Sequence, residues 1–312
     1  MKSKIRVYWY RYDKGHGNFG DELNPYLIEK LSGKSVVYTA PYYDTKLNII
    51  KSILYIIVKK RSYRALRSFD GWNTLFDRKI IIAIGSVLST ATDKNIVWGS
   101  GIMSKNGKIH PAKFCAVRGK YSQKRLDELG YKIPHAIGDP ALLLPLIYKP
   151  VKKKKYKLGI IPHYVHYDLL NHLNKDIKVI NLLDSIEKIT DEINSCEITL
   201  STSLHGIIVS HAYGIPSRWV AFDETSKNEL SGDNIKFWDY FSSVNLSDMP
   251  VLHLGSFQRH EWIDLSFDEF KRNPSDFLPN AERIEQIQKD LLSVAPFPVK
   301  KEFKNQLNKF SK

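Results

Sequence analysis

Cysteine is scarce in this chain of 312 residues, and long apolar runs are missing. The two cysteines, Cys115 and Cys196, each border an apolar strand-like run. That placement predicts buried reduced thiols, and it favours neither a disulfide framework nor a cysteine zinc site. No apolar run approaches the length that spans a bilayer, and the charged opening residues lack the apolar core of a signal peptide. The sequence therefore predicts a cytoplasmic protein.

Enzyme motifs with a fixed spacing are missing as well. The chain has no Gly-x-Ser-x-Gly elbow, which argues against an acyl hydrolase. Its first glycine-rich loop lacks the spacing of a Walker or dinucleotide loop. His163, His166 and His172 follow one strand end, but no carboxylate cluster accompanies them, so we predict no metal site.

Positive charge, by contrast, is abundant, and the formal net charge is +14. Lysine is concentrated in residues 46–67, 152–155 and 300–312. Such charge attracts three classes of partner, namely nucleic acid, an acidic membrane surface and small anionic substrates. A solvated lysine-rich surface without a partner is the alternative for each cluster.

Residues 46–67 hold seven basic side chains and no acidic one, around the apolar run 49–58. The run is too short to cross a bilayer. One hypothesis makes the segment a peripheral contact with the anionic inner face of the cytoplasmic membrane. Its position between strands of the first predicted sheet favours the other hypothesis, an ordinary buried helix with a basic end.

Apolar runs rich in isoleucine, valine and tyrosine alternate with helical patterns, which is typical of βαβ units with parallel sheets. The strands predicted for a first sheet are 5–10, 79–84, 95–98, 113–117 and 135–138. Those predicted for a second sheet are 157–161, 177–180, 197–200 and 218–222. Prolines and a lysine run separate the two series. We predict two Rossmann-like doubly wound α/β domains, residues 1–148 and 156–275, then a helix and a loosely ordered basic tail in 276–312.

Ligands of such sheets bind beyond the carboxyl ends of the strands, where loops and helix N-termini meet. The first candidate is the glycine-rich loop at 15–20, followed by a helix that Gly33 closes. Its backbone suits an anion, although a structural turn explains it equally well. Arg118 follows a strand, and its planar fork suits the carboxylate or phosphate of a ligand, or a neighbouring carboxylate of the protein.

The third candidate is the run 201–216, in which a helix is predicted to begin near Ser203 and to end before Gly214. His205 lies in the first turn of this helix, off its apolar stripe. An imidazole there stands where anions bind, as a proton donor or phosphate ligand. A histidine that only satisfies local structure is the alternative.

These candidates stand in a fixed order with further motifs. The stretches are GNFGDELNPYLIEKL, AVRGKYSQKRLDELGY with IGDPALLL, and STSLHGIIVSHAYGIP with KFWDYF. In this combination the chain resembles the polysaccharide pyruvyltransferase family from about residue 5 to 245. The resemblance implies a GT-B-like fold with the active site in a cleft, the acceptor on the first domain and the donor on the second. A C-terminal helix is expected to cross back to the first domain.

The resemblance also implies a reaction. The enolpyruvyl group of phosphoenolpyruvate is transferred to two hydroxyls of a sugar, as a cyclic ketal, in a capsular or exopolysaccharide pathway. No cofactor and no nucleic acid take part, and the acceptor is a sugar, galactose-type or lipid-linked.

Two rival classes of function stay open. A glycosyltransferase using a nucleotide sugar shares the fold, and a basic nucleic-acid-binding protein shares the charge, although glycines and a histidine at strand ends argue against the latter.

His205 matches the histidine of the family's Leu-His pair, so the resemblance assigns it phosphate binding and proton delivery. Asp21 is the candidate that orients or deprotonates the acceptor hydroxyl, with helix capping as its alternative. Well-known members of the family carry arginine where this chain has Ser203, so either another cation, Lys236 or Lys227, replaces that phosphate clamp or the donor is held differently. The remaining candidates are Arg118, Leu204, Gly206, Lys227 and Lys236 beside Ser203 for the donor, and Asn18, Gly20, Glu22 and Asp139 for the acceptor.

Overall fold

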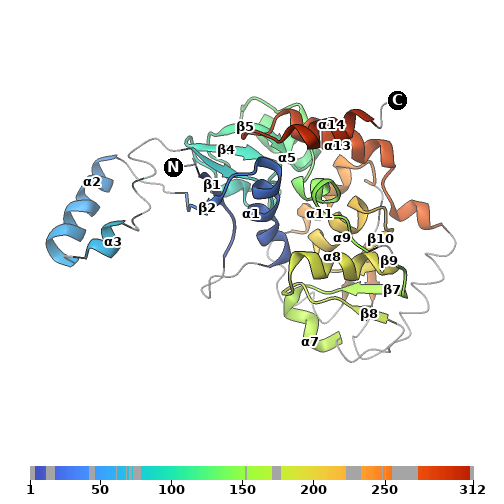
Figure 1. The fold of residues 1–312 in the computed structure, drawn as a ribbon. Coiled ribbons are helices and arrows are strands. Elements are labelled where there is room, and N and C mark those ends of the chain that lie inside the picture. The colour runs from blue at the N-terminus through green and yellow to red at the C-terminus, as the bar shows by residue number, and fades with distance from the viewer. Residues whose placement is uncertain are drawn as a thin grey trace.

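Two parallel sheets flanked by helices make up the body of the computed structural model (Figure 1). It describes residues 4–11, 18–41, 46–60, 62–67, 69, 72, 79–151, 153–170, 177–222, 233–247, 249, 251–254 and 273–309. The predicted α/β class with two parallel sheets is confirmed, because every strand pair of both sheets is parallel.

The first sheet has six strands in the order β2-β1-β3-β4-β5-β6. They are β1 (Ile5–Tyr8), β2 (Val36–Tyr38), β3 (Ile80–Ile82), β4 (Asn95–Trp98), β5 (Lys113–Val117) and β6 (Ala136–Ile137). Helix α1 (Phe19–Ser32) follows β1, and α5 (Lys120–Glu128) follows β5. Strand β2 was not predicted, because a half-buried edge strand of three residues has too short an apolar pattern to stand out.

The second sheet has five strands in the order β11-β10-β9-β7-β8. They are β7 (Tyr156–Ile161), β8 (Ile177–Val179), β9 (Cys196–Ser201), β10 (Ser217–Phe222) and β11 (Leu252–Leu254), of which β11 was not predicted. The helices beside it are α7 (Tyr167–Leu170), α8 (Ile186–Asn194), α9 (Leu204–Ala212) and α11 (Ile235–Ser243). Cys196 is buried and Cys115 half-buried, and both are free thiols.

Helix α1 shows how local sequence sets the elements that carry the site. Its apolar side chains at Leu23, Leu27 and Leu31 are fully buried, and Gly33 ends the helix with a φ of 67°, which favours glycine. Pro25 lies inside the helix and has no N–H for the carbonyl of Asp21. The side-chain amide of Asn24 donates to that carbonyl over 3.0 Å instead. The start of α1 therefore keeps its geometry despite the proline.

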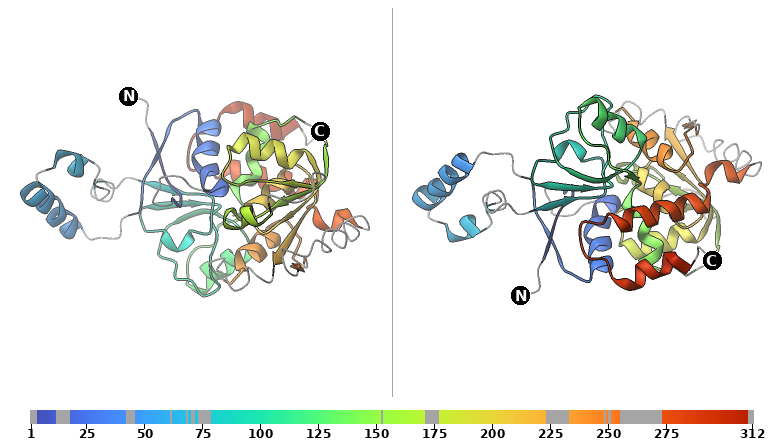
Figure 2. Two further views of the ribbon diagram at one scale, coloured as in Figure 1. Left: turned by 90° about the horizontal axis from the view of Figure 1, so that it is seen from below. Right: turned by 90° about the horizontal axis from the view of Figure 1, so that it is seen from above.

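The last helices, α13 (Ala281–Ser293) and α14 (Lys301–Lys309), lie against elements of the first sheet (Figure 2). The indole N–H of Trp98 in β4 donates to the carbonyl of Leu291 over 2.9 Å. Lys300 donates its backbone N–H to Leu31 of α1 over 2.9 Å. The expectation of a loosely ordered tail is wrong for 301–309, because Phe303 is buried and anchors that helix.

Residues 46–67 form a separate projection. Helix α2 (Lys46–Tyr55), a π-helical turn (Ile56–Lys60) and α3 (Tyr63–Arg67) stand away from the body in both figures. The favoured expectation of an ordinary buried helix is therefore wrong, because several large apolar side chains of the segment are exposed to solvent. Within the described part of the chain, no helix combines the length and the apolar character that crossing a membrane requires.

Candidate active site

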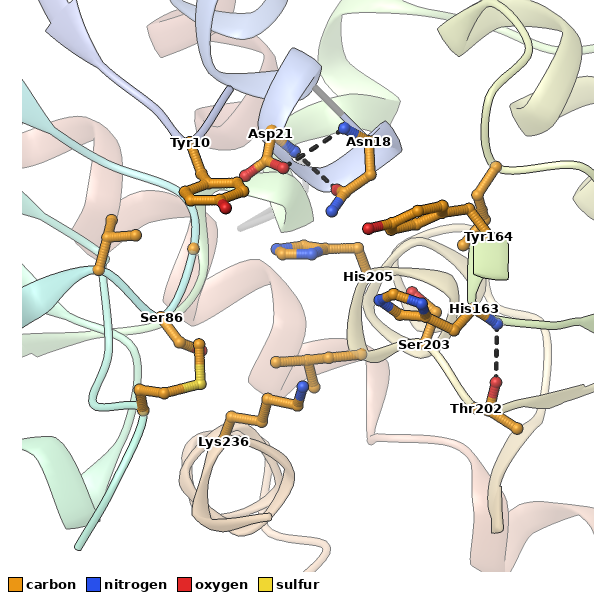
Figure 3. A pocket seen from close by; sticks show the side chains of 15 residues that line it. Tyr10, Asn18, Asp21, Ser86, His163, Tyr164, Thr202, Ser203, His205 and Lys236 are labelled. Atoms are coloured by element: carbon orange, nitrogen blue, oxygen red, sulfur yellow. Dashed lines mark hydrogen bonds between the residues drawn. The ribbon is translucent and has the colours of Figure 1, made fainter. Parts of the chain in front are cut away.

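A cavity of about 390 Å³ lies where the carboxyl ends of both sheets meet (Figure 3). From the first half of the chain it is lined by Tyr10, Asn18, Asp21, Gly85, Ser86, Val87 and Met103. From the second half it is lined by His163, Tyr164, Leu182, Thr202, Ser203, Leu204, His205 and Lys236. Most of these residues follow a strand directly or begin a helix, which is the position that the topology of parallel sheets favours for ligands.

The N-terminus of α1 forms one wall and is capped by its own side chains. Asn18 accepts from the backbone N–H of Asp21 over 3.2 Å, and the Asp21 carboxylate accepts from the N–H of Asn18 over 3.3 Å. Asp21 is thus both a capping residue and a cavity residue, so helix capping is confirmed, and the role of Asp21 toward an acceptor hydroxyl stays a prediction. Burial raises the pKa of Asp21 to about 6, against the opposing effect of nearby His205.

The N-terminus of α9 forms the facing wall and has no side-chain cap. The hydroxyl of Ser201 accepts from the N–H of Ser203 over 3.0 Å and donates to backbone carbonyls. Gly206 is required in the first turn, because a Cβ there would lie 2.5 Å from the Ser201 hydroxyl and 2.7 Å from Ile161. The first-turn amides of α9 therefore open toward the cavity without a side-chain acceptor of their own.

His205 lies between the two walls. Its Nε2 stands 3.7 Å from Oδ2 of Asp139, a carboxylate that is fully buried and caps the turn at Pro140–Leu143 through Oδ1. Gly20 of α1 packs against the other side of the ring, where a Cβ would lie 2.0 Å from Nδ1. The imidazole thus packs against a glycine of the first half of the chain, with the Asp139 carboxylate behind Nε2 but beyond hydrogen-bond distance.

Lys236, at the start of α11, reaches toward the ring from the side opposite Asp21 (Figure 3). Burial lowers the pKa of Lys236 to about 8, with a further contribution from the charge of Arg118. His163 lies beside it, and burial, Lys236 and His166 lower the pKa of His163 to about 4. At neutral pH the cavity therefore holds a lysine cation next to a neutral imidazole.

Arg118 is not part of the cavity lining, contrary to the prediction that it binds a ligand. Its guanidinium is fully buried and pairs with Asp239 of α11, with Nε 3.1 Å from the carboxylate. It also donates to the hydroxyl of Ser86 over 2.7 Å and to the carbonyl of Ile102 over 2.8 Å. The alternative interpretation, a bridge to a protein carboxylate, describes this geometry, and the bridge supports Ser86 from behind.

The other predicted residues divide into three groups. Ser203 and Leu204 line the cavity, as does Asn18, whereas Glu22 does not. Gly20, Gly206 and Asp139 lie behind it and shape or support His205 and its helix. Lys227 and His172 fall outside the described residues. Among the residues that are described, no group of three or more histidine, cysteine or acidic side chains is placed to hold a metal ion.

Sequence reasoning missed several residues that line the cavity. Tyr10 and Ser86 follow β1 and β3, Tyr164 follows β7, and His163 was considered only as a metal ligand. The signal that points to all four is their place at or just beyond the carboxyl ends of predicted strands, where Tyr10 is the last residue of the strand predicted over 5–10.

Known proteins show which family the chain belongs to. The family described as polysaccharide pyruvyl transferase matches residues 18–224, which contain both capped and uncapped helix starts and His205. The chain belongs to the polysaccharide pyruvyl transferase family. It is also similar to an uncharacterized protein of Acanthamoeba polyphaga mimivirus, with 34% identity over 169 residues. That match covers 51% of this chain and 58% of the viral protein, so the chain spans less than two thirds of the length of this relative.

Proposed function

We propose that this chain transfers the enolpyruvyl group of phosphoenolpyruvate onto two hydroxyls of a sugar and releases phosphate. Membership of the polysaccharide pyruvyl transferase family supports the type of reaction. The observation that carries the proposal is the cavity, in which an uncapped helix N-terminus, Lys236 and His205 face Asp21. Phosphoenolpyruvate bears a phosphate and a carboxylate, and backbone amides at a helix start and a lysine are groups that bind such anions.

The chemistry needs an acid and a base in one water-poor site. A proton is added to C3 of phosphoenolpyruvate, which makes C2 electrophilic, and the first sugar hydroxyl adds to C2. The bond between C2 and the phosphate oxygen breaks, and the second hydroxyl adds at C2 to close the ketal. The two hydroxyls lose two protons, of which one balances the proton gained at C3 and the other the proton taken up by the leaving phosphate. Each step is accelerated by a positioned group with a pKa near the working pH.

We assign a role in this reaction to each residue according to the side of the cavity on which it lies. Lys236 and the first-turn amides at Leu204–Gly206 hold the phosphate. Lys236 thereby replaces the arginine that well-known members carry at the position of Ser203. His205, supported by Asp139, delivers the proton to C3. Asp21, whose pKa of about 6 leaves it ionised at neutral pH, accepts the proton of the attacking hydroxyl.

The wider setting is part of the same proposal. The two parallel sheets, with the last helices packed against the first, support a GT-B-like arrangement of domains 1–148, 156–275 and 276–312. The acceptor would be a free or lipid-linked sugar of a surface polysaccharide pathway, handled at the inner face of the cytoplasmic membrane. No cofactor takes part, and nucleic acid is not a partner in this proposal.

A thermal-unfolding titration tests the donor assignment. Phosphoenolpyruvate, pyruvate, phosphate and a nucleoside diphosphate are added separately to the native chain, to Lys236→Met and to Lys132→Met, a control at an exposed lysine away from the cavity. A ligand at a hundred times its Kd stabilises the folded state by about 2.7 kcal/mol, so the native melting temperature should rise by several degrees. We expect the rise with phosphoenolpyruvate to disappear in Lys236→Met and to persist in Lys132→Met.

The pH dependence sharpens this test. Because the pKa of Lys236 is lowered to about 8, the lysine loses its charge above that pH, and the stabilisation by phosphoenolpyruvate should decline there. A rise in melting temperature only with the nucleoside diphosphate would overturn the proposal in favour of a glycosyltransferase. Equal stabilisation of all three chains by phosphoenolpyruvate would remove Lys236 from the donor site.

A further inference from the structure

Residues 46–67, here called the arm, are an insertion between the edge strand β2 and β3 of the first sheet. In three views the arm stands clear of the body (Figures 1 and 2). Its helices therefore contribute little to the core of either sheet. A segment that the core does not need raises the question of what covers its apolar side chains.

Helix α2 and the π-helical turn that continues it, residues 46–60, are here called the long helix of the arm, and this helix has two different faces. Ile49 is fully buried and Ile53 half-buried, and they lie on the same helical face. Ile50, Leu54 and Val58 recur at intervals of four, and their exposed fractions are 45%, 54% and 63%. Tyr63 at the start of α3 is exposed to 77%. An apolar stripe of this kind on a solvent face indicates a contact surface.

Basic residues flank the stripe. Lys51 and Lys59 are exposed beside it on the long helix, and Arg64 is exposed on α3. No aspartate or glutamate occurs anywhere in residues 46–67. An apolar face bordered by charges of one sign is the pattern that lies in the boundary between lipid headgroups and acyl chains.

We propose that the arm docks on an anionic bilayer surface, with Ile50, Leu54 and Val58 in the acyl boundary and the basic residues on the headgroup phosphates. A second copy of the chain matches this face less well, because an isologous contact brings equal positive charges together. Nucleic acid matches it less well too, because the line of Ile50, Leu54 and Val58 is aliphatic and the exposed rings of Tyr55 and Tyr63 are not part of it. The proposal does not depend on the proposed pyruvyl transfer.

In chain order the arm connects the carboxyl end of β2 to the amino end of β3. It leaves the first sheet after the carboxyl end of β2, and β1, β2 and β3 are parallel. Tyr10 and Ser86, which line the cavity, follow the carboxyl ends of β1 and β3. After the arm the chain returns to the amino end of β3, at the opposite edge of the sheet from the cavity.

Vesicle flotation of the full chain tests the docking. The vesicles contain phosphatidylcholine alone, or phosphatidylcholine with an equal amount of phosphatidylglycerol. We expect the native chain to float with the anionic vesicles and to be released by salt. Lys51→Glu/Lys59→Glu should weaken partitioning on the order of tenfold or more, because each basic residue contributes about fivefold at an anionic surface. Ile50→Ser/Leu54→Ser/Val58→Ser should weaken it at least as much.

Matched substitutions on the body serve as controls. Lys132 and Ile133 are adjacent, exposed and distant in sequence from the arm, so Lys132→Glu/Ile133→Ser should float like the native chain. All variants change exposed side chains, and their melting curves show whether they fold. Equal flotation of native and arm variants would overturn the proposal. A second result would also overturn it. The native chain would be a dimer in light scattering, the Ile50→Ser/Leu54→Ser/Val58→Ser variant would be a monomer, and neither would float with vesicles, because the apolar face would then bind a second copy.

Discussion

Two helices, α1 and α9, begin at the same cavity, yet their N-termini differ in charge. At α1 the amides meet the side chains of Asn18 and Asp21, so a carboxylate already occupies the position that an anion would take. At α9 no side chain caps the first turn, and Lys236 stands nearby. The same backbone geometry therefore serves opposite purposes. In the proposed reaction, the capped start would repel an anionic donor and suit a neutral sugar, whereas the uncapped start would attract the donor.

The difference has a simple origin in sequence. The run from Asn18 to Asp21 carries an amide and a carboxylate three positions apart, which satisfy each other's backbone N–H groups. The run from Ser203 to Gly206 holds no carboxylate, and its one hydroxyl does not turn back to cap. His205 is the residue where the two starts meet, because Gly20 of α1 contacts its ring. Substitutions on each side should therefore break the contrast in different ways.

The largest effect is expected at His205. His205→Gln keeps a polar side chain of similar reach but removes the proton donor between the two walls. Loss of a general acid of this kind lowers kcat by about 10²–10⁴-fold. The measurement is the rate of phosphate release from phosphoenolpyruvate with an acceptor sugar, and His135→Gln, an exposed histidine, is the control. A kcat for His205→Gln within threefold of the native value would remove the histidine from the reaction.

The next effect concerns the buried ion pair between Arg118, which follows β5, and Asp239 of α11. Arg118→Met leaves Asp239 buried without its partner, and breaking one side of a buried ion pair costs about 3–5 kcal/mol in the free energy of unfolding. Because Arg118 also holds Ser86, the first-sheet side of the cavity should loosen with it. Urea denaturation measures the loss.

A second variant separates charge from packing. Arg118→Met/Asp239→Leu removes both charges, so it should recover much of the stability lost by Arg118→Met. If Arg118→Met is as stable as the native chain, the ion pair contributes nothing to the free energy of unfolding, and packing alone holds the start of α5 against α11.

Arg118 also shows where sequence reasoning reached its limit. The junction of strand and helix was placed correctly, because both patterns are local, but Asp239 lies 121 positions away and no local signal links the two. His205 was placed correctly for the same local reason, whereas its contacts with Gly20 and Asp139 depend on how the halves of the chain meet. The arm was wrongly expected to be buried, because an apolar run between strands gives no sign of whether it folds back on the sheet.

The smallest effect is a pH dependence on the capped side. The pKa of Asp21 rises from 3.8 in the unfolded chain to about 6 in the folded one, because burial disfavours the carboxylate. The folded state therefore binds this proton more tightly. The stability that the proton contributes is complete below pH 3.8 and is lost as pH rises through about 6, by up to about 3 kcal/mol. Asp21→Asn should lack this dependence, whereas Asp127→Asn, at an exposed carboxylate, should keep it.

The ionisation of Asp21 should also appear in the dependence of kcat/KM on pH. In the native chain kcat/KM should rise with pH through about 6, as Asp21 becomes the carboxylate that accepts the proton of a hydroxyl. In Asp21→Asn this rise should vanish together with most of kcat, while the affinity for phosphoenolpyruvate, set at the uncapped α9, should stay the same or increase. A variant that loses donor affinity as strongly as Lys236→Met would mean that both helix starts bind the donor, and the division of the cavity into two sides would be wrong.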